Sequence, residues 1–158
     1  KAYMNDGGAK GKELAAKYVA AVEKFDAAYA KFNETLNKVN AEQSKKQIEK
    51  LKKDGKKGYA AAMESTLRLT TLVDKLEKAP QNADKAAVEK ELSEIEALLK
   101  SINNDRGQVL ADRYNSVVGD VRQVLADPSD NNLNNMIEGF NGYIDTYNST
   151  TPDQFDAK

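Results

Sequence analysis

The densest cluster of side chains that could perform catalysis or bind a metal ion consists of Glu89, Glu91, Glu94 and Glu96. Paired carboxylates act as general acids and bases when burial shifts one pKa, and di-iron sites in helical bundles combine inward carboxylates with Glu-x-x-His pairs. The chain contains no histidine, and these glutamates fall beside the apolar spacing of their segment. They are therefore predicted to form a solvated helix face, with no catalytic residue and no metal ligand.

Two segments resemble ligand-binding loops without completing their patterns. In a phosphate-binding loop a glycine stands five residues before a Gly-Lys pair, and Ser or Thr follows the pair. In the glycine-rich segment Gly7–Lys12 the pair is Gly11-Lys12, and the two other places hold Asp6 and Glu13. The segment 127–138 has the length of a calcium loop, but Asn132 replaces its sharp-turn glycine. Both segments are predicted to be helix starts, and no cofactor is predicted.

The charge and composition exclude several function classes. The net charge is −1, which gives the chain no general affinity for nucleic acid. Without cysteine, there is no disulfide and no thiolate nucleophile. A lysine-rich run from Lys45 to Lys57 could contact anionic lipid headgroups or the acidic C-terminal half, or be a solvated helix face. Its candidate contact residues are Lys45, Lys46, Lys50, Lys53 and Lys57.

An aromatic residue followed directly by asparagine occurs four times, at positions where the aromatic lies on the apolar face of its segment. Each amide therefore lies beside an interface. Asparagines in such places can set the register between helices, or they can line a polar groove for a ligand. The four candidate residues are Asn33, Asn115, Asn141 and Asn148.

The elements that must position these residues are amphipathic helices. Tyr18, Val22, Phe25, Tyr29, Phe32, Leu36 and Val39 follow a strict 4-3-4-3 spacing, which predicts a helix over about 9–39 with one apolar face. This face is expected to pack against two or more neighbouring helices. Asn40 is predicted to cap a second helix, which continues to about residue 78. Gly55 and Gly58 predict either a kink or a short loop within it.

Three further helices follow from apolar residues at helical spacing. They are predicted over about 88–102, 105–124 and 130–147, with Asp105 and then Ser129 or Asp130 as the caps of the last two. Pro80 and Pro128 end the helices that precede them. No segment alternates with the period of a strand, and no apolar run approaches the length of a membrane span.

The predicted fold is all-α, an elongated antiparallel bundle of four or five helices. One domain is expected to cover residues 1–158, with loose ends at 1–8 and 149–158. Because the sequence begins at Lys1 rather than Met, we expect that any targeting signal or membrane anchor lay upstream of it.

Several short motifs, taken in order along the chain, resemble the YiiG-like family of bacterial lipoproteins and periplasmic proteins of unknown function. They are Asn5-Asp6 after Tyr3, the run Ala9–Lys12, the charged segment 47–58, and the paired aromatic-Asn dipeptides in 131–148. The resemblance implies a helical fold and a location in the periplasm or on the outer membrane. It implies no catalytic residues, and the lipid-bearing cysteine of a lipoprotein is absent from the sequence.

These observations predict an exported, non-enzymatic helical-bundle protein that binds another envelope protein or a surface ligand. Membrane association is expected only through an anchor upstream of Lys1, and no nucleic-acid partner is expected. The alternative is a small-ligand-binding module with a pocket between helices. That pocket would be lined by Phe25, Tyr29, Phe32 and Tyr114.

Overall fold

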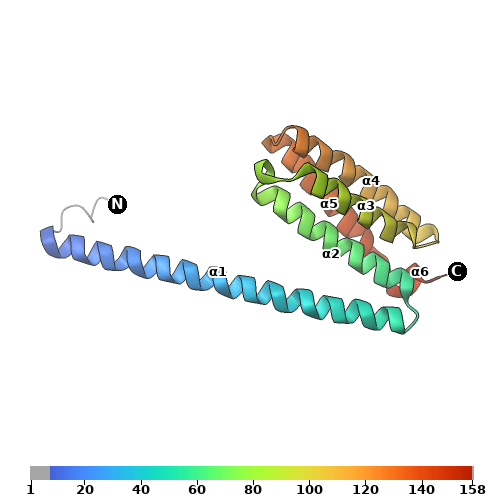
Figure 1. Ribbon diagram of the computed structural model, residues 1–158, viewed down its shortest axis with the longest axis horizontal. Coiled ribbons are helices and arrows are strands. Elements are labelled where there is room, and N and C mark those ends of the chain that lie inside the picture. Colours follow the sequence, from blue (N-terminus) through green and yellow to red (C-terminus); the bar gives the residue numbers. More distant parts are fainter. Residues whose placement is uncertain (1–7, 158) are drawn as a thin grey trace. The chain divides into compact units, whose positions relative to one another are not determined.

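The computed structural model describes residues 8–157, which form helices and no strand (Figure 1). This confirms the predicted all-α fold. The chain divides into two compact units, unit 1 over residues 1–46 and unit 2 over residues 47–158, where the sequence predicts a single domain. Within the described range, no helix combines the length and the apolar character of a membrane span.

Helix α1 runs without interruption from Gly8 to Lys53, so the helix break predicted at Asn40 is wrong. Gln43 and Lys46 interrupt the apolar face, but both residue types have high helix propensity and do not end the backbone hydrogen bonding. The helix stops instead before Gly55, whose φ of +81° lies in the left-handed region that glycine adopts without steric cost. The loop is short and covers residues 54–56, because α1 ends at Lys53 and the next helix already begins at Lys57, before Gly58.

Unit 2 contains four main helices, α2 (Lys57–Lys78), α3 (Lys85–Lys100), α4 (Asp105–Ala126) and α5 (Asp130–Ser149), with the short η2 (Pro80–Asn82) between α2 and α3. Each helix contacts the next one, and α5 returns to contact α2, which closes a four-helix bundle (Figure 1). Its largest fully buried side chains include Leu69, Leu76, Ile95, Leu110, Tyr114, Met136 and Tyr143.

Side-chain caps determine where three of these helices begin. Asp84 accepts hydrogen bonds from the amides of Ala86 and Ala87 at the start of α3. Ser129 caps α5, as predicted, by accepting from the amide of Asn132. The cap of α4 is Asn104, one residue before the predicted Asp105. Each cap satisfies amide groups that have no partner within the helix.

The C-terminal segment is folded onto unit 2, so the expectation of a loose end at 149–158 is wrong. Helix α6 (Pro152–Phe155) starts with a capping box between Thr151 and Gln154, and Phe155 is 2% exposed. Asp156 accepts hydrogen bonds from the amides of Gly58 and Tyr59, at 2.6 and 3.2 Å. Burial of one aromatic ring and two bonds to the start of α2 hold the segment in place. The other predicted loose end, residues 1–8, lies outside the described residues except for Gly8, which begins α1.

Candidate functional site

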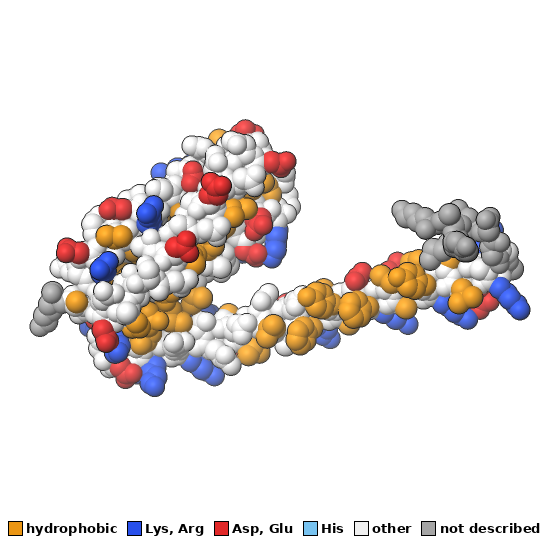
Figure 2. Space-filling model, turned by 180° about the vertical axis from the view of Figure 1, so that it is seen from behind, with side chains coloured by type: hydrophobic (Ala, Val, Ile, Leu, Met, Phe, Trp, Pro, Cys, Tyr) orange, Lys and Arg blue, Asp and Glu red, His pale blue; other side chains and the backbone are white. Residues whose placement is uncertain are grey.

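Within unit 1 the apolar face of α1 is exposed, because α1 is the one helix that the structure describes in this unit. We call its seven residues at 4-3-4-3 spacing the α1 stripe. Their exposed fractions range from 38% to 69%, and a row of hydrophobic side chains is visible along the helix in Figure 2. The residues of the α1 stripe are Tyr18, Val22, Phe25, Tyr29, Phe32, Leu36 and Val39. An exposed apolar surface of this extent is a mark of an interaction site.

Aromatic rings dominate the centre of the α1 stripe. The rings of Phe25 and Tyr29 stack with their centroids 6.2 Å apart and their planes 8° from parallel. Leu14 and Val19 beside the stripe are also exposed, so they widen the apolar surface. Large rings bring much apolar area at a small cost in conformational entropy, which is why interfaces are rich in them.

A row of lysines runs along the polar side of α1 with the period of the α1 stripe. Every seventh residue is a lysine, at Lys10, Lys17, Lys24, Lys31, Lys38 and Lys45. Lys17 and Lys38 form ion pairs with Glu13 and Glu34, one turn earlier on the same helix. The sequence prediction did not identify this row, although its seven-residue period is visible in the sequence. These charges are compatible with a solvent-facing side opposite an interface.

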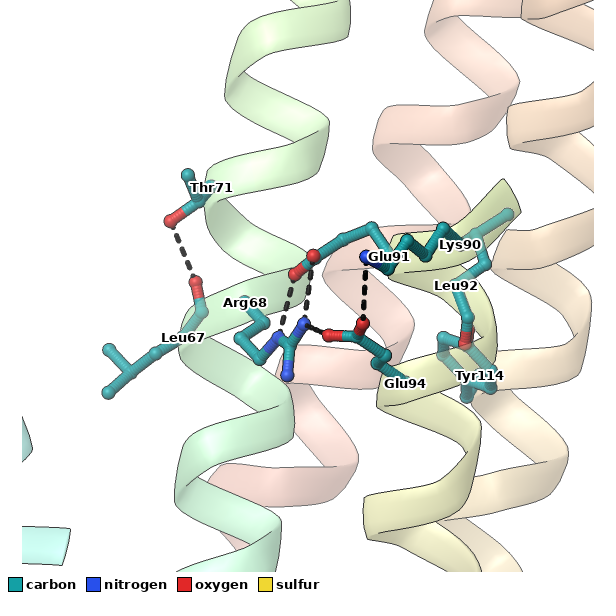
Figure 3. A network of polar contacts seen from close by, with 8 residues as sticks. All are labelled: Leu67, Arg68, Thr71, Lys90, Glu91, Leu92, Glu94 and Tyr114. Atoms are coloured by element: carbon teal, nitrogen blue, oxygen red, sulfur yellow. Dashed lines mark hydrogen bonds and ion pairs between the residues drawn. The ribbon is translucent and has the colours of Figure 1, made fainter. Parts of the chain in front are cut away.

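Three members of the glutamate cluster in unit 2 are paired with arginines, and Figure 3 shows Arg68 with two of them, Glu91 and Glu94. Glu91 accepts two hydrogen bonds from Arg68, at 2.7 and 2.9 Å, and Glu94 accepts a third from the same guanidinium. Arg68 therefore lowers the pKa of the Glu91 carboxyl below its usual range. Glu89 forms a similar two-bond pair with Arg122 of α4, at 2.9 Å for each bond. These pairs join α2 to α3 and α3 to α4, and carboxylates neutralised in this way are poor general bases.

A second polar group lies inside unit 2. The Tyr143 hydroxyl is 3.2 Å from Ser65 Oγ and 3.1 Å from Thr66 Oγ1, and both of these hydroxyls also donate to the Ala62 carbonyl. Burial raises the pKa of Tyr143. Because Ser65 and Tyr143 are fully buried, no substrate reaches this network, and its role is to satisfy polar groups within the core.

The predicted aromatic pocket does not form. Tyr114 lies in the core of unit 2 with 2% exposure, and its hydroxyl donates to the Leu92 carbonyl at 2.5 Å. Phe25, Tyr29 and Phe32 belong to unit 1 and are exposed. A side chain that its own bundle encloses cannot also line a cavity with these rings. The alternative of a small-ligand pocket built from these four residues is therefore wrong.

Three of the four candidate asparagines, Asn115, Asn141 and Asn148, belong to the bundle of unit 2, and Asn33 belongs to unit 1. Asn115, Asn141 and Asn148 are exposed and Asn33 is half-buried. Among the described residues, none of the four amides forms a side-chain hydrogen bond to a facing helix. Each asparagine follows an aromatic residue by one position, and one position rotates the side chain about 100° away from the apolar face.

The predicted lysine patch is a set of exposed side chains. Lys45, Lys46, Lys50, Lys53 and Lys57 are all exposed. The ion pairs of this region are formed by two other lysines, Lys52 with Glu64 at 2.7 Å and Lys56 with Asp153 at 3.1 Å. Lys50 and Lys53 lie in the last turn of α1, where positive charge is favourable near the carbonyl end of the helix.

An open groove of about 590 Å³ lies where α2, η2 and α3 meet in unit 2. Its lining includes the apolar Leu72, Leu76 and Val88 and charged residues such as Arg68 and Lys75. Arg68 is already bound by Glu91 and Glu94. Within the described residues, no group of three or more potential ligands could hold a metal ion. The α1 stripe is therefore the strongest candidate for a functional surface.

A family model described as "Protein of unknown function (DUF3829)" matches residues 1–126. The chain belongs to this family. The DUF3829 match includes all of α1 and ends with Ala126, the last residue of α4. No curated protein and no solved structure matches the chain.

Proposed function

We propose that this DUF3829 protein is a non-enzymatic binding protein of the bacterial cell envelope, and that it binds another protein through the α1 stripe. The single observation that supports this role is the exposure of seven apolar residues, four of them aromatic, on one face of α1. In folded proteins most helical stability comes from packing of the apolar face. The exposed face of α1 would obtain this stabilisation from a partner.

The absence of enzymatic activity is part of the proposal. It is supported by the pairing of Glu89, Glu91 and Glu94 with arginines and by the enclosure of Tyr143 in the core. The envelope location is supported by the resemblance of several short motifs to the YiiG-like lipoproteins and periplasmic proteins. Fractionation of cells that express the natural gene tests it, with the protein expected in the periplasmic or outer-membrane fraction. Recovery in the cytosol would contradict the location.

Site-specific photo-cross-linking tests the binding role. A photo-reactive phenylalanine analogue replaces Phe25 or Phe32 in the α1 stripe, and in the control it replaces Ala27, which is exposed on the same helix. Adducts to a second polypeptide, identified by mass spectrometry, are expected from positions 25 and 32 and not from position 27. Equal labelling from all three positions, or cross-links only within one chain, would refute the proposal.

A further inference from the structure

We propose that the occupant of the α1 stripe is the α1 helix of a second copy of this chain, in an antiparallel pair centred on Ala27. This inference rests on the proposed use of the α1 stripe as a binding face. It names the partner by its chemistry, a helix with the same apolar period and with one charged residue, Asp26, along its border.

The period of the α1 stripe fits a helix partner. Apolar residues repeat every seven positions without a shift from Tyr18 to Val39. On a straight helix such a row drifts by about 20° per heptad, and it becomes a straight contact line when two helices supercoil around each other. With Ala15 added at its start, the contact line is about 36 Å long at 1.5 Å per residue.

The order of large and small residues fits an antiparallel pair. When positions at equal distance from Ala27 face each other, Tyr18 meets Leu36 and Val22 meets Phe32. Phe25 meets Tyr29 at the centre, where rings pair with rings. In a parallel pair in register, each ring would face the same ring of the second copy. The smaller residues would then also face one another. Alternation of large and small residues across an interface gives the denser packing.

The two ends of the contact line are also symmetric about Ala27. The apolar pattern stops at Gly11 on one side and at Gln43 on the other, and these residues are equally far from Ala27. In the antiparallel pair, Gln43 of one helix therefore meets Gly11 of the other. An unrelated partner would give no reason for this symmetry, whereas a two-fold axis requires a self-complementary surface.

The charges permit self-association. The eight residues that border the contact line from position 14 to position 40 include one charged residue, Asp26; they are Leu14, Val19, Ala21, Asp26, Ala28, Asn33, Thr35 and Asn40. The lysines repeat one position further out, so like charges do not meet at the contact line. Only Asp26 would lie near its own copy. This neutral border provides no charge pattern by which a different helix would be selected.

The available surface is large enough for a stable pair. The four rings of the α1 stripe are 59% to 69% exposed, and at 150–250 Å² for each ring they offer roughly 500 Å² per copy. With the aliphatic residues, this approaches the value of about 800 Å² per partner found in standard interfaces.

Cysteine cross-linking tests the arrangement in the full-length chain, which has no cysteine of its own. Ala15→Cys and Val39→Cys place one thiol at each end of the contact line. With a short thiol cross-linker, covalent dimers are expected when the two variants are mixed, and neither variant alone should form them. Cross-linking of Val39→Cys alone would show a parallel pair and overturn the inference, and so would a lack of cross-linking in every mixture.

Sedimentation of the full-length chain measures the strength of the pair. Phe25→Ser with Phe32→Ser is expected to weaken dimerisation roughly tenfold or more, whereas the control Ala20→Ser with Ala27→Ser leaves it unchanged. Asp26→Asn is expected to strengthen it about twofold by removing one like-charge contact. Circular dichroism verifies that α1 is helical in each variant, and unchanged association of the Phe25/Phe32 variant would overturn the inference.

The outcomes separate this inference from the proposed function. A monomeric chain whose photo-adducts at position 25 contain a different protein keeps the proposed function and refutes the second copy. A monomeric chain that floats with anionic phospholipid vesicles through the α1 stripe refutes both. Cross-links from the α1 stripe to residues of the same chain also refute both.

Discussion

Two helices of this protein have apolar residues at the same spacing and opposite environments. Val88, Leu92, Ile95 and Leu99 of α3 are between 0% and 7% exposed, whereas Phe25 of α1 is 69% exposed. The spacing therefore identifies the apolar face of a helix and does not identify what covers that face. In unit 2 the cover of α3 comes from α2 and α4, which lie on either side of it in the closed bundle.

Replacement of one core residue and one stripe residue by alanine tests the difference between the two helices most directly. Ile95→Ala removes a fully buried side chain and is expected to lower the free energy of unfolding of unit 2 by about 2–5 kcal/mol. Phe25→Ala removes a larger side chain, and its expected effect on unit 2 is within about 0.5 kcal/mol. Urea unfolding in dilute solution measures both, followed by tyrosine absorbance, which changes as the buried Tyr114 and Tyr143 become exposed. Equal losses would show that the α1 stripe belongs to the core.

A pair of glycine variants compares a crowded position with an open one. A Cβ at Gly58 would overlap the carbonyl group of Phe155, whereas a Cβ at Gly119 of α4 would meet nothing. Gly58→Ala is expected to displace α6 and to destabilise unit 2 by about 1–3 kcal/mol. Hydrogen exchange of residues 152–157 is expected to increase in this variant.

Gly119→Ala is the matched control, because it adds the same methyl group at an exposed position of a helix. It is expected to stabilise unit 2 by about 0.5–1 kcal/mol through higher helix propensity. Unchanged exchange at residues 152–157 in Gly58→Ala would show that the close approach of Phe155 does not hold the C-terminal segment.

Local signals in the sequence predicted most of the fold. The spacing of apolar residues found the four main helices of unit 2 and missed the short η2 and α6, and proline and capping residues placed most of the ends of the main helices. The predictions failed where distant residues decide the outcome. Phe155 is buried because Gly58 leaves room for its backbone, and the two residues are far apart in the sequence. The alternative prediction placed Phe32 and Tyr114 in one pocket because both are aromatic residues on apolar faces, yet the helices of unit 2 enclose Tyr114.

Removal of single hydroxyl groups compares the two regions on a finer scale. Tyr143→Phe leaves Ser65 and Thr66 without their phenol partner in the core and is expected to cost about 0.5–1.5 kcal/mol of unfolding free energy. Tyr29→Phe is the control, because the Tyr29 side chain is exposed on α1. Thermal unfolding of the two variants side by side measures the difference. A Tyr143→Phe protein as stable as the parent would mean that this network contributes nothing to stability.

The smallest change in stability is expected from loss of an ion pair between two helices, compared with loss of an ion pair within one helix. Arg68 of α2 lowers the pKa of Glu91 of α3 below its ordinary value of 4.5, so the folded state favours the ionised carboxylate. This stabilisation is fully present above about pH 4.5 and is lost as the pH falls through the lower pKa of the folded state. Glu91→Gln is therefore expected to lower the melting temperature at pH 7, by an amount equivalent to up to about 1 kcal/mol for a partly exposed pair.

At pH values below the folded-state pKa of Glu91, the variant and the parent are expected to melt together, because both then lack the charge. Glu34 of α1 pairs with Lys38 on its own helix, and its pKa is also lowered. Glu34→Gln is expected to leave the melting of unit 2 unchanged at every pH, since this pair joins no two elements. If the melting temperature of Glu91→Gln stays below that of the parent at low pH, the effect comes from packing of the side chain rather than from its charge. The contrast between the two pairs would then have no electrostatic basis.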